Sequence, residues 1–433
     1  MKLKIKNIET SLNPHEVYEA VRGKNTIFLD SSKEDEKLAK FSFIGINPFK
    51  IKESKNFNGL EKELQKYKYE FEGINESPFL AGAIGYISYD TFTELEDIKD
   101  NSEEDFKIPN LRFVFFNNII IYNHKTKEYY ISDIEGSDSR INDIISKINN
   151  FSVIGKTFEY DRETKFNSNF TRNEYIDAVT KMKDYIKSGD VYIANMTQRF
   201  WCDNNDDSFE IYLKLRDINK APFSAYLDFE DFQVISSSPE RFIQIVDGKA
   251  HTRPIKGTRP RGNTLEEDER NKIELLNSEK DKAELLMVVD LERNDLSKVC
   301  KPFSVKVTEL FELEEYATVF HLVSTVEGEL QDTETSVNCI KECFPGGSIT
   351  GTPKIRAMEV IEELEGLKRN LYTGCIGYFD FNGNSDFNIV IRTIVKKDGK
   401  AYFGVGGGIT YDSIEEDEYE ETLDKAKALM RVL

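Results

Sequence analysis

Short apolar runs separated by charged turns fill the first third of the chain. The runs at 25–29, 79–86 and 113–122 are brief and contain many aromatic and branched residues, a pattern that predicts β-strands. The first six residues alternate polar with apolar side chains, which is typical of an edge strand. We therefore expect a β-rich N-terminal region over residues 1–165.

A clear helical pattern begins after the polar stretch 160–169. Thr171 stands at the N-cap position, apolar residues recur at helical spacing through Ile186, and Gly189 follows as a stop. This change of pattern predicts a second region over residues 166–433.

Strands and helices alternate irregularly in this second region. Strands are predicted at 232–237 and 389–395, and amphipathic helices at 265–289, 353–364 and 415–431. Because no steady strand–helix–strand rhythm appears, we expect an α+β fold, a layered and sandwich-like β-sheet with helices outside, and not a doubly wound parallel sheet.

Composition narrows the class of protein. The chain has 433 residues, 39% of them hydrophobic, and a formal net charge of −20. A chain of this composition folds. Its negative charge repels nucleic acid, and an anionic substrate would need a local cationic or metal-bearing pocket.

Five cysteines without a C-x-x-C pair indicate reduced thiols. No signal peptide or 18-residue apolar run is present, so we expect a cytoplasmic protein with no membrane contact.

The loop 253–262 places Lys256 among three arginines, between Pro254 and Gly257. Fixed positive charges nearby disfavour the ammonium form of a lysine, so Lys256 is a candidate nucleophile. A plain basic surface loop is the alternative.

Two acidic pairs on predicted helices are candidate metal ligands. Asp281 and Glu284 are three residues apart, as are Glu418 and Glu421, so each pair projects from one helix face. Two such pairs facing each other form an oxygen-only site that suits Mg²⁺. Taken separately, acidic pairs of this kind are usually solvated.

Other candidates lie in loops and at strand ends. The segment 346–354 resembles a phosphate loop but lacks the Walker spacing, and together with glycines 406–408 it offers backbone N–H groups to a carboxylate. A β-bulge is the alternative at the glycines. Burial at a strand end fits Glu240 as a general acid, with a salt bridge to Arg241 as the competing account. His321 lies in an apolar run, where a satisfied buried histidine is the alternative.

From about residue 170 to the C-terminus the chain resembles the chorismate-utilising enzymes, whose fold is that of anthranilate synthase component I. The resemblance rests on the following segments, in this order: GDVYIANMTQRF, SSPERF, RPIKGTRPRG, EKDKAELLMVVDLERNDL, HLVSTVEG, FPGGSITGTPKIRAMEVIEELE, YTGCIGYFDFNG, IVIRT and GVGGGIT. The N-terminal region resembles the family loosely, through FLDSS and FSFIGINPF.

The resemblance implies a role for each candidate. Lys256 would attack chorismate and Glu240 would act as general acid and base, with His321 near the ring. Mg²⁺ would be held by Glu284 and Glu418, with Asp281 and Glu421 close by. The remaining implied substrate-binding residues are Gly257, Thr258, Ser348, Tyr372, Arg392, Gly407 and Gly408, with Arg392 and Tyr372 gripping the enolpyruvyl carboxylate.

Within the family, Lys256 resembles the aminodeoxychorismate synthases, since anthranilate synthases usually carry alanine there. This branch uses ammonia, and no glutaminase signature is present, so the resemblance implies a separate glutamine amidotransferase subunit. Ile193 departs from the pattern, because relatives that activate water carry lysine there and many ammonia users carry glutamine.

Three other functions stay open at this stage. An anthranilate synthase component would share most motifs but should lack Lys256. A chorismate-binding regulatory subunit would bind without turnover. A magnesium-dependent phosphotransferase would need a better phosphate loop than 346–354 provides.

Overall fold

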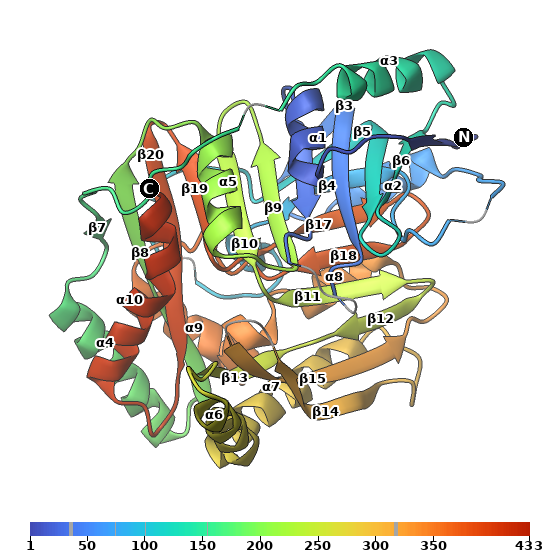
Figure 1. The fold of residues 1–433 in the computed structure, drawn as a ribbon. Coiled ribbons are helices and arrows are strands. Elements are labelled where there is room, and N and C mark those ends of the chain that lie inside the picture. Colours follow the sequence, from blue (N-terminus) through green and yellow to red (C-terminus); the bar gives the residue numbers. More distant parts are fainter. Residues whose placement is uncertain (34–37, 74, 100, 154, 316–318) are drawn as a thin grey trace.

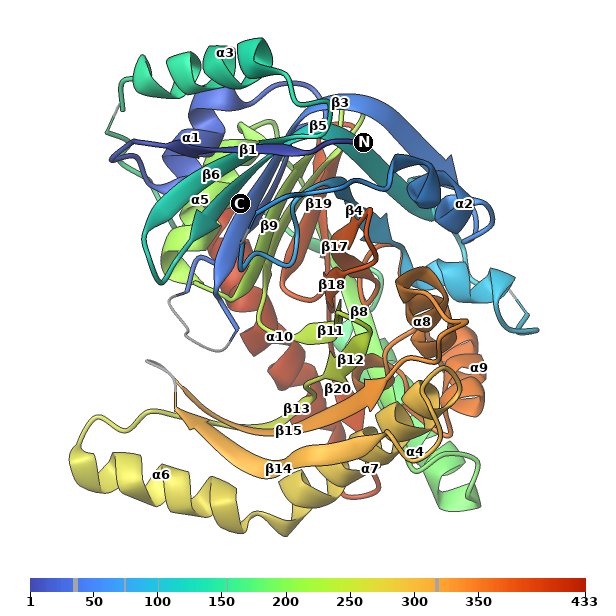
Figure 2. The same cartoon turned by 90° about the vertical axis from the view of Figure 1, so that its right-hand side faces the viewer.

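The computed structural model describes residues 1–33, 38–73, 75–99, 101–153, 155–315 and 319–433. Its strands form one continuous hydrogen-bonded network, and every ladder among the described residues is antiparallel. Helices lie outside the strands (Figure 1 and Figure 2). The predicted layered α+β fold is confirmed, and the parallel alternative is excluded.

The N-terminal region is β-rich, as predicted. The strands at 25–29, 79–86 and 113–122 are present with ends shifted by a few residues, and the first strand pairs with β6. The elements are β1 (Lys4–Ile8), α1 (Pro14–Val21), β2 (Ile27–Asp30), β3 (Phe41–Ser54), α2 (Leu60–Leu64), η1 (Gln65–Tyr67), β4 (Gly82–Ile87), η2 (Tyr89–Glu94), β5 (Leu111–Asn123), β6 (Glu128–Asp133) and α3 (Asp138–Asn149).

The second region carries the remaining elements. They are β7 (Asn167–Ser168), α4 (Arg172–Ser188), β8 (Ile193–Asp203), α5 (Ser208–Ile218), β9 (Phe223–Asp228), β10 (Gln233–Ser238), β11 (Arg241–Val246), β12 (Lys249–Thr252), β13 (Ile255–Pro260), α6 (Leu265–Asn277), α7 (Glu279–Ser297), β14 (Lys306–Glu315), β15 (Val319–Glu329), α8 (Ser336–Cys343), η3 (Gly347–Ile349), β16 (Gly351–Thr352), α9 (Lys354–Glu365), β17 (Cys375–Asp380), β18 (Ser385–Asn388), β19 (Thr393–Lys397), β20 (Lys400–Ile409) and α10 (Glu415–Val432).

Helix α4 begins and ends where its sequence predicts. The Thr171 hydroxyl accepts a hydrogen bond from Glu174 N, and the Glu174 carboxylate accepts one from Thr171 N at 2.8 Å. Gly189 closes the helix in the left-handed conformation, with φ +84°. The apolar face of α4 packs with α9 against β8, which fixes one wall of the site described below.

Two sequence predictions are wrong in detail. The helix expected over 265–289 is two helices, because Ser278 ends α6 and its hydroxyl accepts from Asp281 N to begin α7. The strand expected over 389–395 starts only at Thr393, since Arg392 adopts φ +51° and interrupts the extended chain.

Strands from the two regions pair with each other. β2 pairs with β9, and β4 pairs with β17, so one sheet network spans the boundary placed at residue 165. The division of the chain at that point stays a prediction.

All five cysteines are unpaired and buried. Within the described ranges, no helix has the length and apolar character that crossing a membrane requires.

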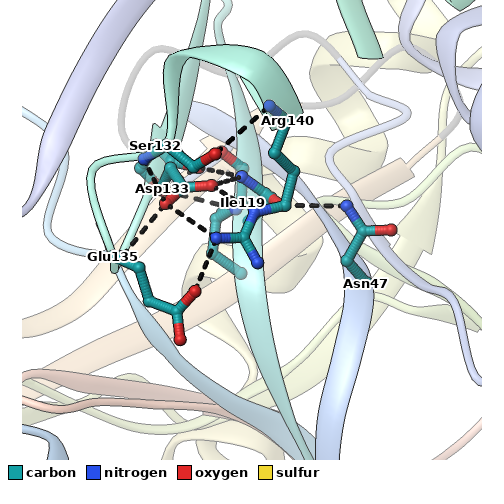
Figure 3. A network of polar contacts seen from close by, with 8 residues as sticks. Asn47, Ile119, Ser132, Asp133, Glu135 and Arg140 are labelled. Atoms are coloured by element: carbon teal, nitrogen blue, oxygen red, sulfur yellow. Dashed lines mark hydrogen bonds and ion pairs between the residues drawn. The ribbon is translucent and has the colours of Figure 1, made fainter. Parts of the chain in front are cut away.

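A buried aspartate anchors α3 to the N-terminal sheet (Figure 3). Asp133 is fully buried and accepts hydrogen bonds from Asn118 Nδ2 at 2.9 Å and from Arg140 Nε at 2.7 Å. Arg140 also reaches Glu135 at 2.6 Å. Because this buried carboxylate is fully paired, it fixes the turn from β6 into α3.

A second buried carboxyl group links η2 to the segment that precedes β17. Asp90 is 5% exposed and accepts a hydrogen bond from Asn370 N at 2.9 Å. Burial and the nearby Glu362 carboxyl raise the pKa of Asp90 to about 7.

We predict that Asp90→Asn makes the protein more stable at alkaline pH. Because the folded pKa of Asp90 is raised, the folded state holds its proton between about pH 4 and 7, and stability falls as the pH rises through that window. Removing the charge should recover about 4 kcal/mol at pH 8 and about 2 kcal/mol at pH 5. Urea unfolding at both pH values measures this, and equal gains at the two would contradict it.

Candidate active site

Lys256 is placed by a bulge in β13. Lys256 pairs with Leu322 and Thr258 pairs with His321 of β15, so Gly257 is the extra residue between them. Gly257 has φ +76°, and a Cβ there would lie 2.9 Å from the Asp281 side chain. The missing side chain therefore lets β13 approach α7. The Lys256 ammonium donates to Ser348 O at 3.2 Å.

The arginines of the Lys256 loop do not form the cationic surroundings that the sequence suggested. Arg253 pairs with Glu309 and with Glu314, the latter at 2.7 Å. The other two pairs are Arg259 with Glu274 and Asp281, and Arg261 with Asp268. Carboxylates neutralise all three guanidinium groups. The prediction that fixed positive charges surround Lys256 is therefore wrong.

Glu240 faces Lys256 from the turn between β10 and β11. Its backbone is fixed by a hydrogen bond from Ile389 N to Glu240 O at 3.0 Å, and the residue is 7% exposed. Burial raises the pKa of Glu240, opposed by the Ser348 side chain and by the positive charge of Lys256. Arg241 pairs instead with Asp386 at 3.0 Å, which leaves Glu240 outside the salt bridge considered for it.

The two predicted acidic pairs lie on α7 and α10 and act on each other. Burial raises the pKa of Glu284, Lys256 and Lys280 lower it, and Asp281 and Glu421 raise it further. Burial also raises the pKa of Glu418, and Ser413 donates to this carboxyl group at 2.6 Å. Carboxyl groups from both helices therefore share one region beside Lys256.

This carboxyl set fits a hard cation in part. Asp281 already pairs with Arg259 at 3.2 Å, and Glu421 with Lys425 at 2.6 Å. Across the described part of the chain, no group of three or more His, Cys, Asp or Glu side chains is arranged to hold a metal unaided. Glu284 and Glu418 carry oxygen donors of the kind that Mg²⁺ prefers, and magnesium binding by these residues stays a prediction.

Glycines of β20 bring the lysine and the carboxyl groups together. A Cβ on Gly407 would lie 3.0 Å from Glu418 Oε2. A Cβ on Gly408 would lie 3.2 Å from Ile193 Cδ1 and 3.8 Å from Lys256 Nζ. The bare backbone of β20 thus lets Glu418 approach at Gly407 and Lys256 approach at Gly408, and Ile193 lies next to the amine.

Arg392 and His321 interact with each other, and of the two only Arg392 carries a positive charge at pH 7. The Arg392 guanidinium donates to Asn219 Oδ1 at 3.3 Å, and none of the described carboxylates forms an ion pair with it. Burial, followed by the charge of Arg392, lowers the pKa of His321 to about 4, so its imidazole is neutral at pH 7. His321 Nδ1 lies 3.0 Å from Thr258 Oγ1.

Tyr372 is the predicted residue with the least connection to the others. Its ring packs on Gly404, where a Cβ would lie 2.4 Å from it. Burial raises the pKa of Tyr372, and its charged neighbours are Arg369 and Glu365. No hydrogen bond joins it to Arg392 among the described residues, so its role in gripping a carboxylate stays a prediction.

Sequence reasoning missed Glu292 and Lys425. Glu292 of α7 accepts from Thr252 Oγ1 at 3.0 Å, and burial together with the nearby Glu240 raises its pKa well above the ordinary value. Lys425 donates to Gly406 O at 2.8 Å. Glu292 gave no signal beyond one more acid in a helix with many charged residues, and Lys425 forms an i, i+4 pair with Glu421 that resembles a surface pair.

A separate cavity of about 310 Å³ lies between β2, β3, β9, β11 and β17. None of the predicted site residues lines it, and Arg241 and Asp386 form part of its wall. The chemistry suggested by Lys256 and its neighbours is therefore not located there.

Comparisons with known proteins find relatives over most of the chain. The chorismate binding enzyme family matches residues 20–431. The chain is 42% identical to aminodeoxychorismate synthase component 1 of Bacillus subtilis, over 84% of this chain and 79% of that protein. It is 37% identical to anthranilate synthase component 1 of Acetivibrio thermocellus, over 94% of this chain and 89% of that protein.

Solved structures show the same fold. Anthranilate synthase component I from Streptococcus pneumoniae has a TM-score of 0.82 at 30% identity, covering 98% of this chain and 99% of that one. The menaquinone-specific isochorismate synthase of Escherichia coli has a TM-score of 0.77 at 13% identity, covering 99% and 95%. The second likeness concerns the fold alone.

We predict that the His321 imidazole titrates near pH 4 in the free protein. Arg392→Gln should raise that pKa, because it removes the second cause of the depression while burial remains. NMR titration of His321 in both proteins measures the shift. A His321 signal that titrates near 6.5 and is unaffected by Arg392→Gln would contradict the arrangement.

Proposed function

The chain belongs to the family of chorismate binding enzymes, and from this premise we propose that it is the synthase component of an aminodeoxychorismate synthase. It would convert chorismate and ammonia into 4-amino-4-deoxychorismate, with ammonia supplied by a separate glutamine amidotransferase subunit. The observation that carries the proposal is the place of Lys256, whose amine lies beside Ser348 and Gly408 and interacts with Glu240 and Glu284.

In the first step, the Lys256 amine forms a bond to C2 of chorismate. The two ring double bonds shift and the C4–O bond breaks. Glu240, whose pKa is raised by burial, gives its proton to the departing hydroxyl, which leaves as water. Two substitutions with allylic shift thus replace one difficult direct displacement.

In the second step, ammonia forms a bond to C4, the double bonds shift back and the C2–N bond breaks. The Lys256 amine is regenerated, and the new ammonium group at C4 returns a proton to Glu240. Ile193, whose side chain lies near Lys256, cannot activate water and so argues against isochorismate and salicylate chemistry.

Binding is divided between the two sides of the site. Arg392, without a carboxylate partner among the described residues, would bind the enolpyruvyl carboxylate, and the neutral His321 would lie near the ring. Glu284 and Glu418, with Asp281 and Glu421 close by, would hold Mg²⁺, which supplies positive charge for the ring carboxylate. The two carboxylates of chorismate would then be neutralised from opposite sides.

An anthranilate synthase component is the second candidate. The 37% identity to the Acetivibrio thermocellus protein and the likeness to the Streptococcus pneumoniae structure favour it. That reaction eliminates pyruvate and gives an aromatic product, so the products separate the two functions.

We predict that the purified chain, given chorismate, Mg²⁺ and an ammonium salt at mildly alkaline pH, forms a product with the mass of aminodeoxychorismate. Omitting Mg²⁺ should abolish it. Liquid chromatography with mass detection measures this, and anthranilate as the product would instead establish the second candidate.

Lys256→Ala should lower turnover by about 100-fold or more, because it removes the attacking amine. Wild-type protein mixed with chorismate without ammonia should gain the mass of chorismate minus water, and the variant should not. Intact-protein mass spectrometry measures this. Lys249→Ala, at an exposed position on β12, is the matched control and should keep the adduct. Full-rate formation of aminodeoxychorismate by Lys256→Ala would sink the mechanism.

A further inference from the structure

Arg392 differs from the buried arginines that the structure describes. Each of those is paired with a carboxylate of the chain, namely Arg112 with Asp231, Arg199 with Asp105, Arg241 with Asp386, Arg253 with Glu314 and Arg369 with Glu365. Arg392 is half-buried, and burial lowers the pKa of its guanidinium without any described carboxylate to offset the loss of water. The fold therefore keeps this positive charge available to a ligand.

The guanidinium of Arg392 is held by a neutral group. Asn219 Oδ1 accepts a hydrogen bond from Arg392 Nη1 at 3.3 Å, and no other hydrogen bond from this side chain is found within the described ranges. An amide oxygen is uncharged, so it directs the guanidinium without neutralising it. A carboxylate in the same place would form an ion pair, with which a substrate carboxylate would have to compete.

The Asn219 amide is itself fixed in one orientation. Asn219 follows the last residue of α5, and its backbone N–H donates to Leu215 O at 2.9 Å. Asn219 Nδ2 donates to Ser237 Oγ at 3.3 Å, and the Ser237 hydroxyl donates to Asn219 O. Because a guanidinium can only donate, the amide must turn its oxygen to Arg392 and its NH₂ group to Ser237. Asparagine suits this place because its amide carries both an acceptor and a donor.

Ser237 also connects this contact to the backbone of Arg392. Ser237 N donates to Arg392 O at 3.1 Å, next to the point where Ser236 of β10 pairs with Thr393 of β19. The side chain of Arg392 is thus bound by Asn219, and its backbone by the residue that binds Asn219. Two linked anchors of this kind fix the direction of a long side chain before a ligand arrives.

We propose that Asn219 is a positioning residue, which holds Arg392 aimed at the enolpyruvyl carboxylate of the substrate and free of an ionic partner. The inference rests on the function proposed above, in which Arg392 binds that carboxylate. The neutral amide leaves the full charge of the guanidinium for the substrate. The fixed orientation also reduces the entropy that a long side chain loses when the substrate binds.

The test changes the charge at Asn219 while keeping its size. Asn219→Asp has the same shape but places a carboxylate against Arg392, so it should raise the KM for chorismate about tenfold or more. Its kcat at saturating chorismate should stay within about threefold of wild type, because the contact acts in binding. Asn219→Ala removes the acceptor without adding a charge and should raise KM by a smaller factor. Steady-state kinetics with ammonium chloride measures both constants.

Binding is measured separately from turnover. Calorimetric titration with chorismate on the Lys256→Ala background, where no adduct forms, should show the same rise in Kd for Asn219→Asp. The matched control is Asn149→Asp, the same substitution at an exposed position on α3, which should change neither Kd nor KM.

His321 provides a readout that a loss of packing would not reproduce. After burial, the charge of Arg392 is the next cause that lowers the pKa of His321 to about 4. Lys33 and Glu314 are the other charged groups that act on this imidazole, and the substitution leaves them in place. A carboxylate beside Arg392 should therefore raise the pKa of His321 in Asn219→Asp, as measured by NMR titration.

Each outcome decides for or against the proposal. An unchanged chorismate Kd in Asn219→Asp would overturn it, as would a loss confined to kcat or a His321 pKa that stays near 4. Should Asn219→Asp fail to fold, the KM and Kd of Asn219→Ala decide. A wild-type chain that forms anthranilate or no product would contradict the proposed function, while the Kd comparison and the His321 titration would still judge Asn219.

Discussion

The site depends on holding one lysine among several buried or half-buried carboxyl groups. Glu240, Glu284 and Glu418 each have a raised pKa, and burial is the first cause in every case. Lys256 and hydroxyl groups of Ser348 and Ser413 offset part of this cost. The free site is therefore electrostatically costly, and a ligand that carries positive charge to Glu284 and Glu418 relieves it. The binding free energy gained by relieving this cost is therefore released at Glu284 and Glu418 themselves.

The sheet network gives these groups a rigid support. Lys256 comes from β13, Gly407 and Gly408 from β20, and the carboxyl groups of Glu284 and Glu418 from α7 and α10. Two features of the backbone bring them close, namely the Gly257 bulge toward α7 and the bare glycine backbone of β20 against Glu418. A side chain at Gly257 would push β13 away from α7, and one at Gly407 would push β20 away from Glu418.

The sequence predicted local structure well where the signal was local. Thr171 and Gly189 mark the ends of α4 because capping chemistry involves neighbouring residues. The sequence prediction failed where other features determine the structure. The apolar pattern predicted one helix over 265–289, but Ser278 divides it into two helices. A strand was predicted over 389–395, but Arg392 interrupts it by adopting a left-handed conformation. The pairing of Arg253 with Glu309 and Glu314, more than fifty residues away, could not be read from the basic loop. Glu292 was missed for the same reason, since its importance depends on nearness to Glu240.

The pairing of β8 with β20 has a consequence for how the chain is made. Met196 is the partner of Gly407, so β8 leaves the ribosome roughly 200 residues before the strand it needs, a delay of about 10–40 s at ordinary synthesis rates. During this time the long edge of β8 is open to pairing with other chains. Expression that slows translation late in the message would lengthen this exposure, so the yield of folded protein should depend on chaperone capacity more than on the stability of the finished fold.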